Sequence, residues 1–151
     1  MSVNIALHLL SAVVWVGGMF FAHMALRPSA AQVLEPPHRL QLWVQVFRRF
    51  FLWVWLSIIV ILVTGYWMLF GVFGGFANAG IHIHLMHGGG IVMVLIYLHI
   101  FFAPYRRLRH AVVVQDYPEG GKQLAQIRKL VTLNLSIGLI VVLVASGGRY
   151  L

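Results

Sequence analysis

The chain has 151 residues, of which 61% are hydrophobic and 9% are charged, and its mean hydropathy is +0.90. This composition lies far outside the range of soluble domains and excludes a water-soluble enzyme or binding module. The chain has no Cys, which excludes disulfides, thiolate metal sites and haem attached through Cys-x-x-Cys-His. We therefore expect a single integral membrane domain over residues 1–151.

The apolar runs predict four membrane-spanning helices. A span needs about 20 apolar residues, and the uncharged stretch 50–105 is long enough to cross twice, with a glycine-rich break at 71–80. The predicted helices lie near 3–26, 50–72, 81–104 and 126–148. Because backbone polar groups need internal partners in lipid, the predicted fold is all-α, a four-helix bundle.

The first predicted helix is interpreted as a permanent span. It has no basic start, and its apolar run is longer than the usual core of a cleavable signal. After it, Leu40, Trp43 and Phe47 recur at helical spacing with arginines between them. This pattern predicts a short interfacial helix near 38–48 that leads into the second span.

The cations predict the orientation of the bundle. They lie between the first and second helices and between the third and fourth, whereas the connection between the second and third carries no charge. Since Lys and Arg favour cytoplasmic loops, we expect both basic loops in the cytoplasm and both termini on the periplasmic side. Together with attraction to anionic lipid, this asymmetry explains the net charge of +8. The expected partner is the lipid bilayer, and no nucleic acid is expected.

Two histidine pairs with the same spacing lie in the first and third predicted helices: His8 with His23, and His84 with His99. Fifteen residues of helix separate two imidazoles by roughly 22 Å along the axis and about 60° around it. Polar side chains in lipid are costly and usually functional. Because these helices run in the same direction, we expect His8 to meet His84 or His87 at the outer level. At the inner level, His23 is expected to meet His99.

Paired imidazoles between parallel helices are typical ligands of b-type haem. Small residues beside them would leave a gap for the macrocycle, and arginines near the helix ends would pair with its propionates. The candidates are Gly17, Gly18, Gly88, Gly89 and Gly90 for the gap, and Arg27, Arg106, Arg107 and Arg149 for the propionates. The leading hypothesis is a b-type haem protein, most economically with two bis-His haems, that transfers electrons across the bilayer.

Copper is the competing cofactor. The run His84-Leu-Met86-His87 combines two imidazoles and a thioether in one turn, a ligand set that suits copper(I). Further thioethers on the same helices are those of Met19, Met24 and Met93. Met is also common filler in apolar helices. A proton relay would need buried carboxylates, and the three acidic residues lie in loops. A structural subunit whose histidines are satisfied by neighbours stays open.

Several stretches resemble a known family. The run from His8 to Phe21, HLLSAVVWVGGMFF, followed by Arg27-Pro28, is similar to the first helix of the copper-resistance D (CopD) type of integral membrane protein. The end of the third helix, 103–109, and the stretch from 126–131 to 146–150 resemble small stand-alone members of that group. The resemblance implies a bacterial inner-membrane protein with a role in copper uptake or tolerance.

The first helix is also similar to that of a small four-helix, haem-binding family that oxidises protoporphyrinogen. That resemblance implies His8 as a haem ligand. The family typically has a Lys shortly after a His in the third helix, whereas this chain offers His84, Met86 and His87 there and no Lys. The departure argues against that enzymatic activity but not against haem binding. The sequence leaves open whether the chain is an enzyme. It also leaves open whether the chain binds a quinone, a redox partner protein or a second copy of itself.

Overall fold

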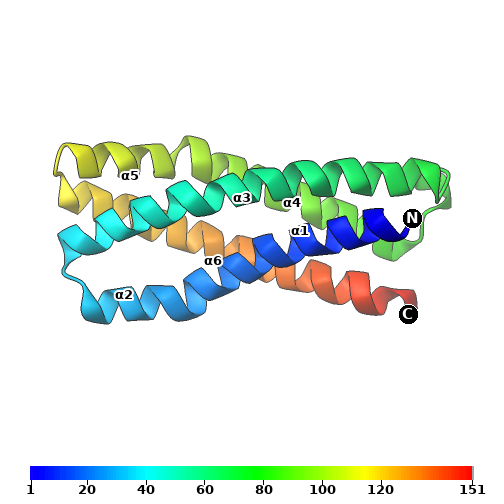
Figure 1. The fold of residues 1–151 in the computed structure, drawn as a ribbon, viewed down its shortest axis with the longest axis horizontal. Helices are drawn as coiled ribbons and strands as arrows, with labels where there is room; N and C mark the ends of the chain where they lie inside the picture. The colour runs from blue at the N-terminus through cyan, green and yellow to red at the C-terminus, as the bar shows by residue number, and fades with distance from the viewer. Residues whose placement is uncertain (151) are drawn as a thin grey trace.

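The computed structural model describes residues 1–150 without the side chain of Arg149, and within that range every regular element is helical. Four stretches are long and apolar enough to cross a membrane: Ser2–Val33, Pro36–Gly71, Ile81–Val113 and Tyr117–Gly147. They run alternately up and down, and both termini lie at the same end as the connection between the second and third (Figure 1). The predicted all-α fold with four spans is confirmed, and the side of the membrane that holds the termini stays a prediction.

The first span changes its helical register in its second half. It consists of α1 (Ser2–Phe21), a five-residue π-helix (Ala22–Leu26) and α2 (Arg27–Val33). Pro28 lacks an N–H, and its ring crowds the carbonyl one turn earlier, which disturbs regular helix pairing. Directly before it, the N–H of Arg27 donates to the carbonyl of Ala22, five residues back. The span therefore continues seven residues beyond the predicted end at residue 26.

The third span is interrupted at the corresponding place. Helix α4 (Ile81–Phe102) ends before Ala103, and α5 (Pro104–Val113) begins at the proline that follows. Between them, Ala103 has φ −115° and ψ −90°, outside the helical region. In each of these two spans a histidine, His23 or His99, precedes the proline by five residues. The two parallel spans thus share a break near one end.

The second and fourth spans are continuous helices, α3 (Pro36–Gly71) and α6 (Tyr117–Gly147). The segment expected as a separate interfacial helix forms the first turns of α3, because nothing between Pro37 and Gly65 interrupts the helix. Helix α6 begins nine residues earlier than predicted. Its start is capped by Asp116, whose Oδ1 accepts the N–H of Glu119 at 3.3 Å.

The connection between α3 and α4 is the glycine-rich break that the sequence indicates. It contains a single 3-10 turn, Phe76–Asn78. Gly74 and Gly75 have φ of 72° and 104°, in the left-handed region that side chains with a Cβ rarely adopt. A second 3-10 turn, Gly148–Tyr150, follows α6. These residues close the end of the bundle at which both termini lie.

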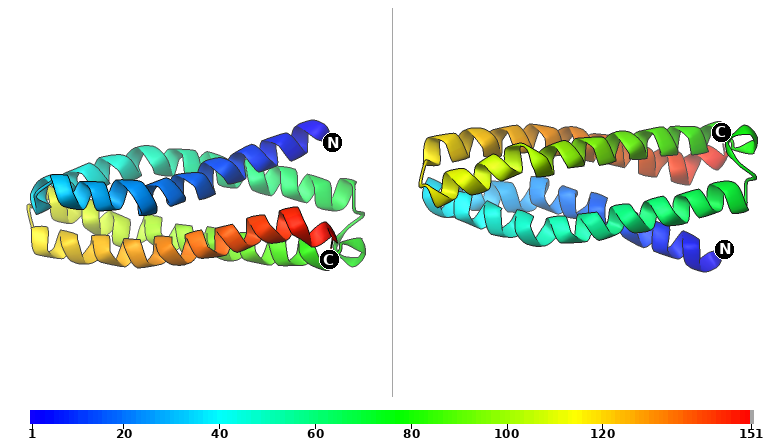
Figure 2. Two further views of the ribbon diagram at one scale, coloured as in Figure 1. Left: turned by 90° about the horizontal axis from the view of Figure 1, so that it is seen from below. Right: turned by 90° about the horizontal axis from the view of Figure 1, so that it is seen from above.

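The bundle consists of two helical hairpins. Helix α1 packs along α3, and α4 with α5 packs along α6; contacts of α3 and α1 with the second hairpin join the two. Figure 2 shows the hairpins as two layers that lie closest at the end of the basic connections. The two parallel spans lie on a diagonal of this arrangement. They touch through Trp15 and Tyr97, whose ring centroids are 6.3 Å apart.

Aromatic side chains fill the centre of the bundle. Phe47, Phe51 and Tyr105 are buried and lie within 6.1 Å of one another, centroid to centroid. Tyr97 joins them and donates its hydroxyl to the backbone carbonyl of Phe51 at 3.1 Å. Edge-to-face aromatic pairs of this kind add to the burial of apolar area. The core near the inner histidine level is therefore packed with protein side chains.

Candidate metal-binding site

His8 is held by the neighbouring antiparallel helix α3. Its Nδ1 lies 2.9 Å from Oγ1 of Thr64, and that hydroxyl donates its single proton to the carbonyl of Val60 at 2.6 Å. In the neutral imidazole, Nδ1 must then be the donor, which leaves the lone pair on Nε2. Gly65 makes room for the ring, since a Cβ there would lie 3.3 Å from His8 Cε1. A ring nitrogen whose partner is fixed in this way is typical of a metal ligand.

His23 repeats this arrangement on the other neighbour, α6. Its Nδ1 lies 3.4 Å from Oγ1 of Thr132, and that hydroxyl donates to the carbonyl of Arg128 at 2.8 Å. The same argument places the lone pair of His23 on Nε2. This contact is longer than that of His8 and therefore weaker. In both cases a threonine that bonds to its own helix fixes the orientation of a histidine on the next one.

His84 and His87 lie in the first two turns of α4, beside the α3–α4 connection. Both rings contact Phe76: His84 is stacked on it at 5.9 Å, and His87 meets it edge-on at 5.0 Å, centroid to centroid. Nε2 of His87 is hydrogen-bonded to the hydroxyl of Tyr66 on α3 at 3.0 Å. Met86 lies in the same turn of α4 and is partly buried. None of these side chains is fully enclosed by the protein.

The contacts that the structure gives for these histidines are with other residues, and the expected facing pairs stay a prediction. At the outer level, His8 contacts Thr64 and His87 contacts Tyr66, two residues of the same turn of α3. At the inner level, His23 contacts α6, and His99 is exposed on the outside of α4. Because α1 and α4 lie on a diagonal, His8 and His23 each meet an adjacent antiparallel helix.

Two of the five glycines expected to flank a macrocycle lie at close contacts between helices. A Cβ at Gly18 would collide with the ring of Phe50 on α3, and one at Gly89 would lie 2.5 Å from Val141 Cγ2 on α6. These two residues bring α1 close to α3 and α4 close to α6. At the remaining three, Gly17, Gly88 and Gly90, an added Cβ would meet no neighbouring atom within 4 Å. The small residues thus face the antiparallel neighbours or open space.

The arginines expected to pair with propionates lie in different surroundings. Arg106 and Arg107 are exposed on α5. Arg27 is partly buried and lines a pocket together with Arg128, a residue that the sequence does not single out. The side chain of Arg149 lies outside the described residues, so its expected role stays a prediction.

A family model described as copper resistance protein D matches residues 44–147 of this chain. The chain belongs to the copper resistance protein D family. The match covers most of α3, all of α4 and α5, and α6 to its end, so it confirms the resemblance. It leaves the first span, with His8 and His23, outside. No curated protein and no solved structure matches the chain. Membership in this family and the four membrane-length helices make the chain a multi-pass membrane protein.

The structure gives no support to a haem held between α1 and α4 in this member of the family. Such a haem needs two imidazoles facing one another across a gap. Here the candidate imidazoles contact other helices, and Trp15 meets Tyr97 between the two levels. The haem hypothesis and its electron-transfer role therefore have no support in the structure.

Imidazole and thioether side chains, which are able to ligate copper(I), lie together at one end of the bundle. Within residues 1–150, no three His, Asp or Glu side chains are gathered to hold a metal ion, so the structure offers at most pairs. The pair in one turn is His84 with His87, and Met86 adds a thioether there. Met19 and Met93 are 4% and 3% exposed and belong to the core. Sequence reasoning missed Thr64, Thr132 and Tyr66, because a single hydroxyl in a span gives no sign of which helix lies beside it.

Proposed function

We propose that this chain handles copper ions in the bacterial inner membrane, in uptake or tolerance, and that His84 and His87 form its capture site. The observation that carries the proposal is the match to the copper resistance protein D family, which includes the whole of α4. Imidazole and thioether ligands suit copper(I), and the turn 84–87 supplies both. Copper is the cargo here and not a resident cofactor.

The charges of α3, of the α3–α4 connection and of α4 favour this end of the bundle as the capture site. Residues 50–105 contain no Lys or Arg. The part of α3 after Arg49, the α3–α4 connection and α4 therefore carry no fixed positive charge that would repel a cation near His84. At the other end, His23 shares a pocket with Arg27 and Arg128. Like charges at short range in a medium of low dielectric constant are strongly unfavourable. His23 is therefore a poor place for a copper ion.

His8 supplies a third imidazole at the level of the capture site, in addition to those of His84 and His87. It contacts Thr64, and His87 contacts Tyr66, so both approach the same turn of α3. The free Nε2 of His8 is the atom that can accept an ion leaving His84 and His87. In this proposal the first span, which the family match does not cover, contributes the next ligand along the path.

The proposal is tested by the copper content of bacterial cells that express the chain. The wild-type chain should change cell copper relative to cells without it, and H84Q/H87Q should remove most of that change. H110Q is the matched control, since His110 is exposed on α5 at the other end. If H84Q/H87Q reaches the membrane at the wild-type level and still changes cell copper by the same amount, the capture site is wrong.

A further inference from the structure

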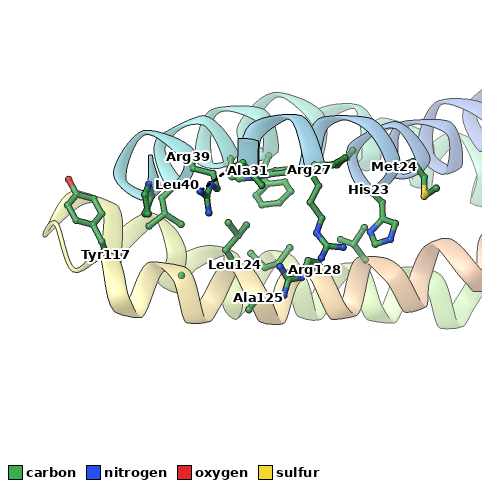
Figure 3. Close-up of a pocket in the computed structure, with 18 residues that line it drawn as sticks. His23, Met24, Arg27, Ala31, Arg39, Leu40, Tyr117, Leu124, Ala125 and Arg128 are labelled. Atoms are coloured by element: carbon green, nitrogen blue, oxygen red, sulfur yellow. Dashed lines mark hydrogen bonds between the residues drawn. The ribbon is translucent and has the colours of Figure 1, made fainter. Parts of the chain in front are cut away.

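A pocket of about 510 Å³ lies at the end of the bundle opposite the capture site. It is formed by the first span from Ala22 onward, the beginning of α3 and the beginning of α6 (Figure 3). Its polar lining consists mainly of Arg27, Arg39, Arg128 and His23. The guanidinium groups of Arg27 and Arg128 point toward one another from opposite walls (Figure 3). Three positive charges from three different elements thus converge on one cavity.

Nothing described in this pocket balances those charges. Among residues 1–150, no side chain that lines the pocket carries a carboxylate. Arg39 donates from Nη2 to the carbonyls of Leu34 at 3.0 Å and Ala31 at 3.4 Å, which are neutral acceptors at the end of α2. Its Nε is buried without a partner. Because like charges in a partly buried site repel one another, an anion between Arg27 and Arg128 would turn this repulsion into attraction.

The remaining walls of the pocket are apolar. They include Leu40, Trp43 and Phe47 from α3, and Leu124 and Val131 from α6. The volume lies within the usual range for small-molecule sites and is much larger than one ion needs. A ligand that fits these walls has an anionic group and an apolar body.

We propose that this pocket binds the headgroup of an anionic phospholipid, with the phosphate between Arg27 and Arg128 and the upper acyl chain along the apolar wall. The pocket lies at the end of the basic connections, which the distribution of cations places on the cytoplasmic side. Anionic lipids of that leaflet attract clusters of Lys and Arg, and basic pockets between spans bind their headgroups. The inference does not rest on copper binding. Soluble phosphates share the headgroup chemistry but not the acyl chain.

Native mass spectrometry of the full-length chain in detergent tests the site. The probes are phosphatidylglycerol and phosphatidylcholine with identical acyl chains. The wild-type chain should retain phosphatidylglycerol in preference to phosphatidylcholine. R27Q/R128Q should weaken phosphatidylglycerol binding about tenfold or more, since each cation near an anionic headgroup contributes substantially. R128Q alone should give a smaller loss, and it is a mild change because Arg128 is exposed.

The matched control is R107Q/K129Q, which removes the same net charge at two exposed positions that do not line the pocket. This variant should keep the wild-type preference. Equal losses in the two double variants would show a general effect of surface charge and overturn the proposal, as would a wild-type chain without lipid preference. If glycerol 3-phosphate displaces phosphatidylglycerol at equal concentration, the ligand is a soluble phosphate and the lipid assignment is wrong.

Discussion

The orientation of the histidines depends on single hydroxyl groups. In their neutral form, His8 and His23 each donate from Nδ1 to a threonine whose own proton is committed to a backbone carbonyl, so each ring presents Nε2 as an acceptor. The sequence predicts these histidines as unusual, because imidazoles in apolar runs are rare. It does not predict Thr64 or Thr132 as their partners, since that depends on which helices become neighbours and in what register.

The role of Thr64 can be tested by removing its hydroxyl. In T64V, His8 loses the side-chain acceptor of its Nδ1 proton, and Nε2 is no longer fixed as the free nitrogen. We expect the effect of the chain on cell copper to fall about tenfold, as is usual when the partner of a metal-ligating histidine is lost. Copper binding by the purified chain at His84 and His87 should be unchanged.

Two variants control this experiment. T64S keeps the hydroxyl and should behave like the wild-type chain. T132V removes the matching hydroxyl beside His23, which lies among arginines, and should leave cell copper unchanged. An equal loss in T64V and T132V would contradict the separate roles assigned to the two histidines.

The helices lie where the apolar runs of the sequence predict them, but several helix ends differ from the predicted ends. The four spans are where hydropathy places them, but the first and third extend past Pro28 and Pro104 through a π-helix and a kink. The segment near 38–48 joins α3 without a break. Hydropathy ends a span where charged residues begin, whereas a helix ends only where backbone pairing fails. The extensions are therefore the part that composition could not predict.

Three consecutive glycines of α4 provide a test of helix packing. At Gly89 a methyl group would lie 2.5 Å from Val141, a short and stiff side chain on α6, whereas Gly88 and Gly90 have open space around them. We expect G89A to lower the free energy of unfolding by about 1–3 kcal/mol through overpacking. G88A and G90A should be neutral or raise it by up to about 1 kcal/mol, because Ala favours helix.

Unfolding of the detergent-solubilised chain by a denaturing detergent, followed by circular dichroism, measures these differences. The three substitutions add the same methyl group to neighbouring positions, so each serves as the control for the others. Equal stability of G88A and G89A would mean that α4 and α6 do not pack closely at Gly89.

At the scale of the whole molecule, the sequence predicts the number and relative direction of the spans but not which of them face one another. Consecutive spans joined by short connections become antiparallel neighbours. The connections here are 34–35, 72–80 and 114–116, so the parallel spans are left on a diagonal. The prediction of facing imidazole pairs uses only the fact that the first and third spans run in the same direction. That fact does not decide which spans are neighbours in the bundle. The copper alternative needs only residues of one turn, and the family match favours it over haem.

The most direct test of the central claim is copper(I) binding by the purified full-length chain, measured in competition with a chromophoric chelator. The account predicts that the wild-type chain binds copper(I) and that H84Q/H87Q lowers its affinity at least tenfold, the usual loss when metal-site groups are removed. H110Q should bind like the wild-type chain. A colourless wild-type chain that binds no copper(I), or a double variant with unchanged affinity, would contradict the account. A red preparation with a reducible Soret band that H8Q removes would restore the haem hypothesis instead.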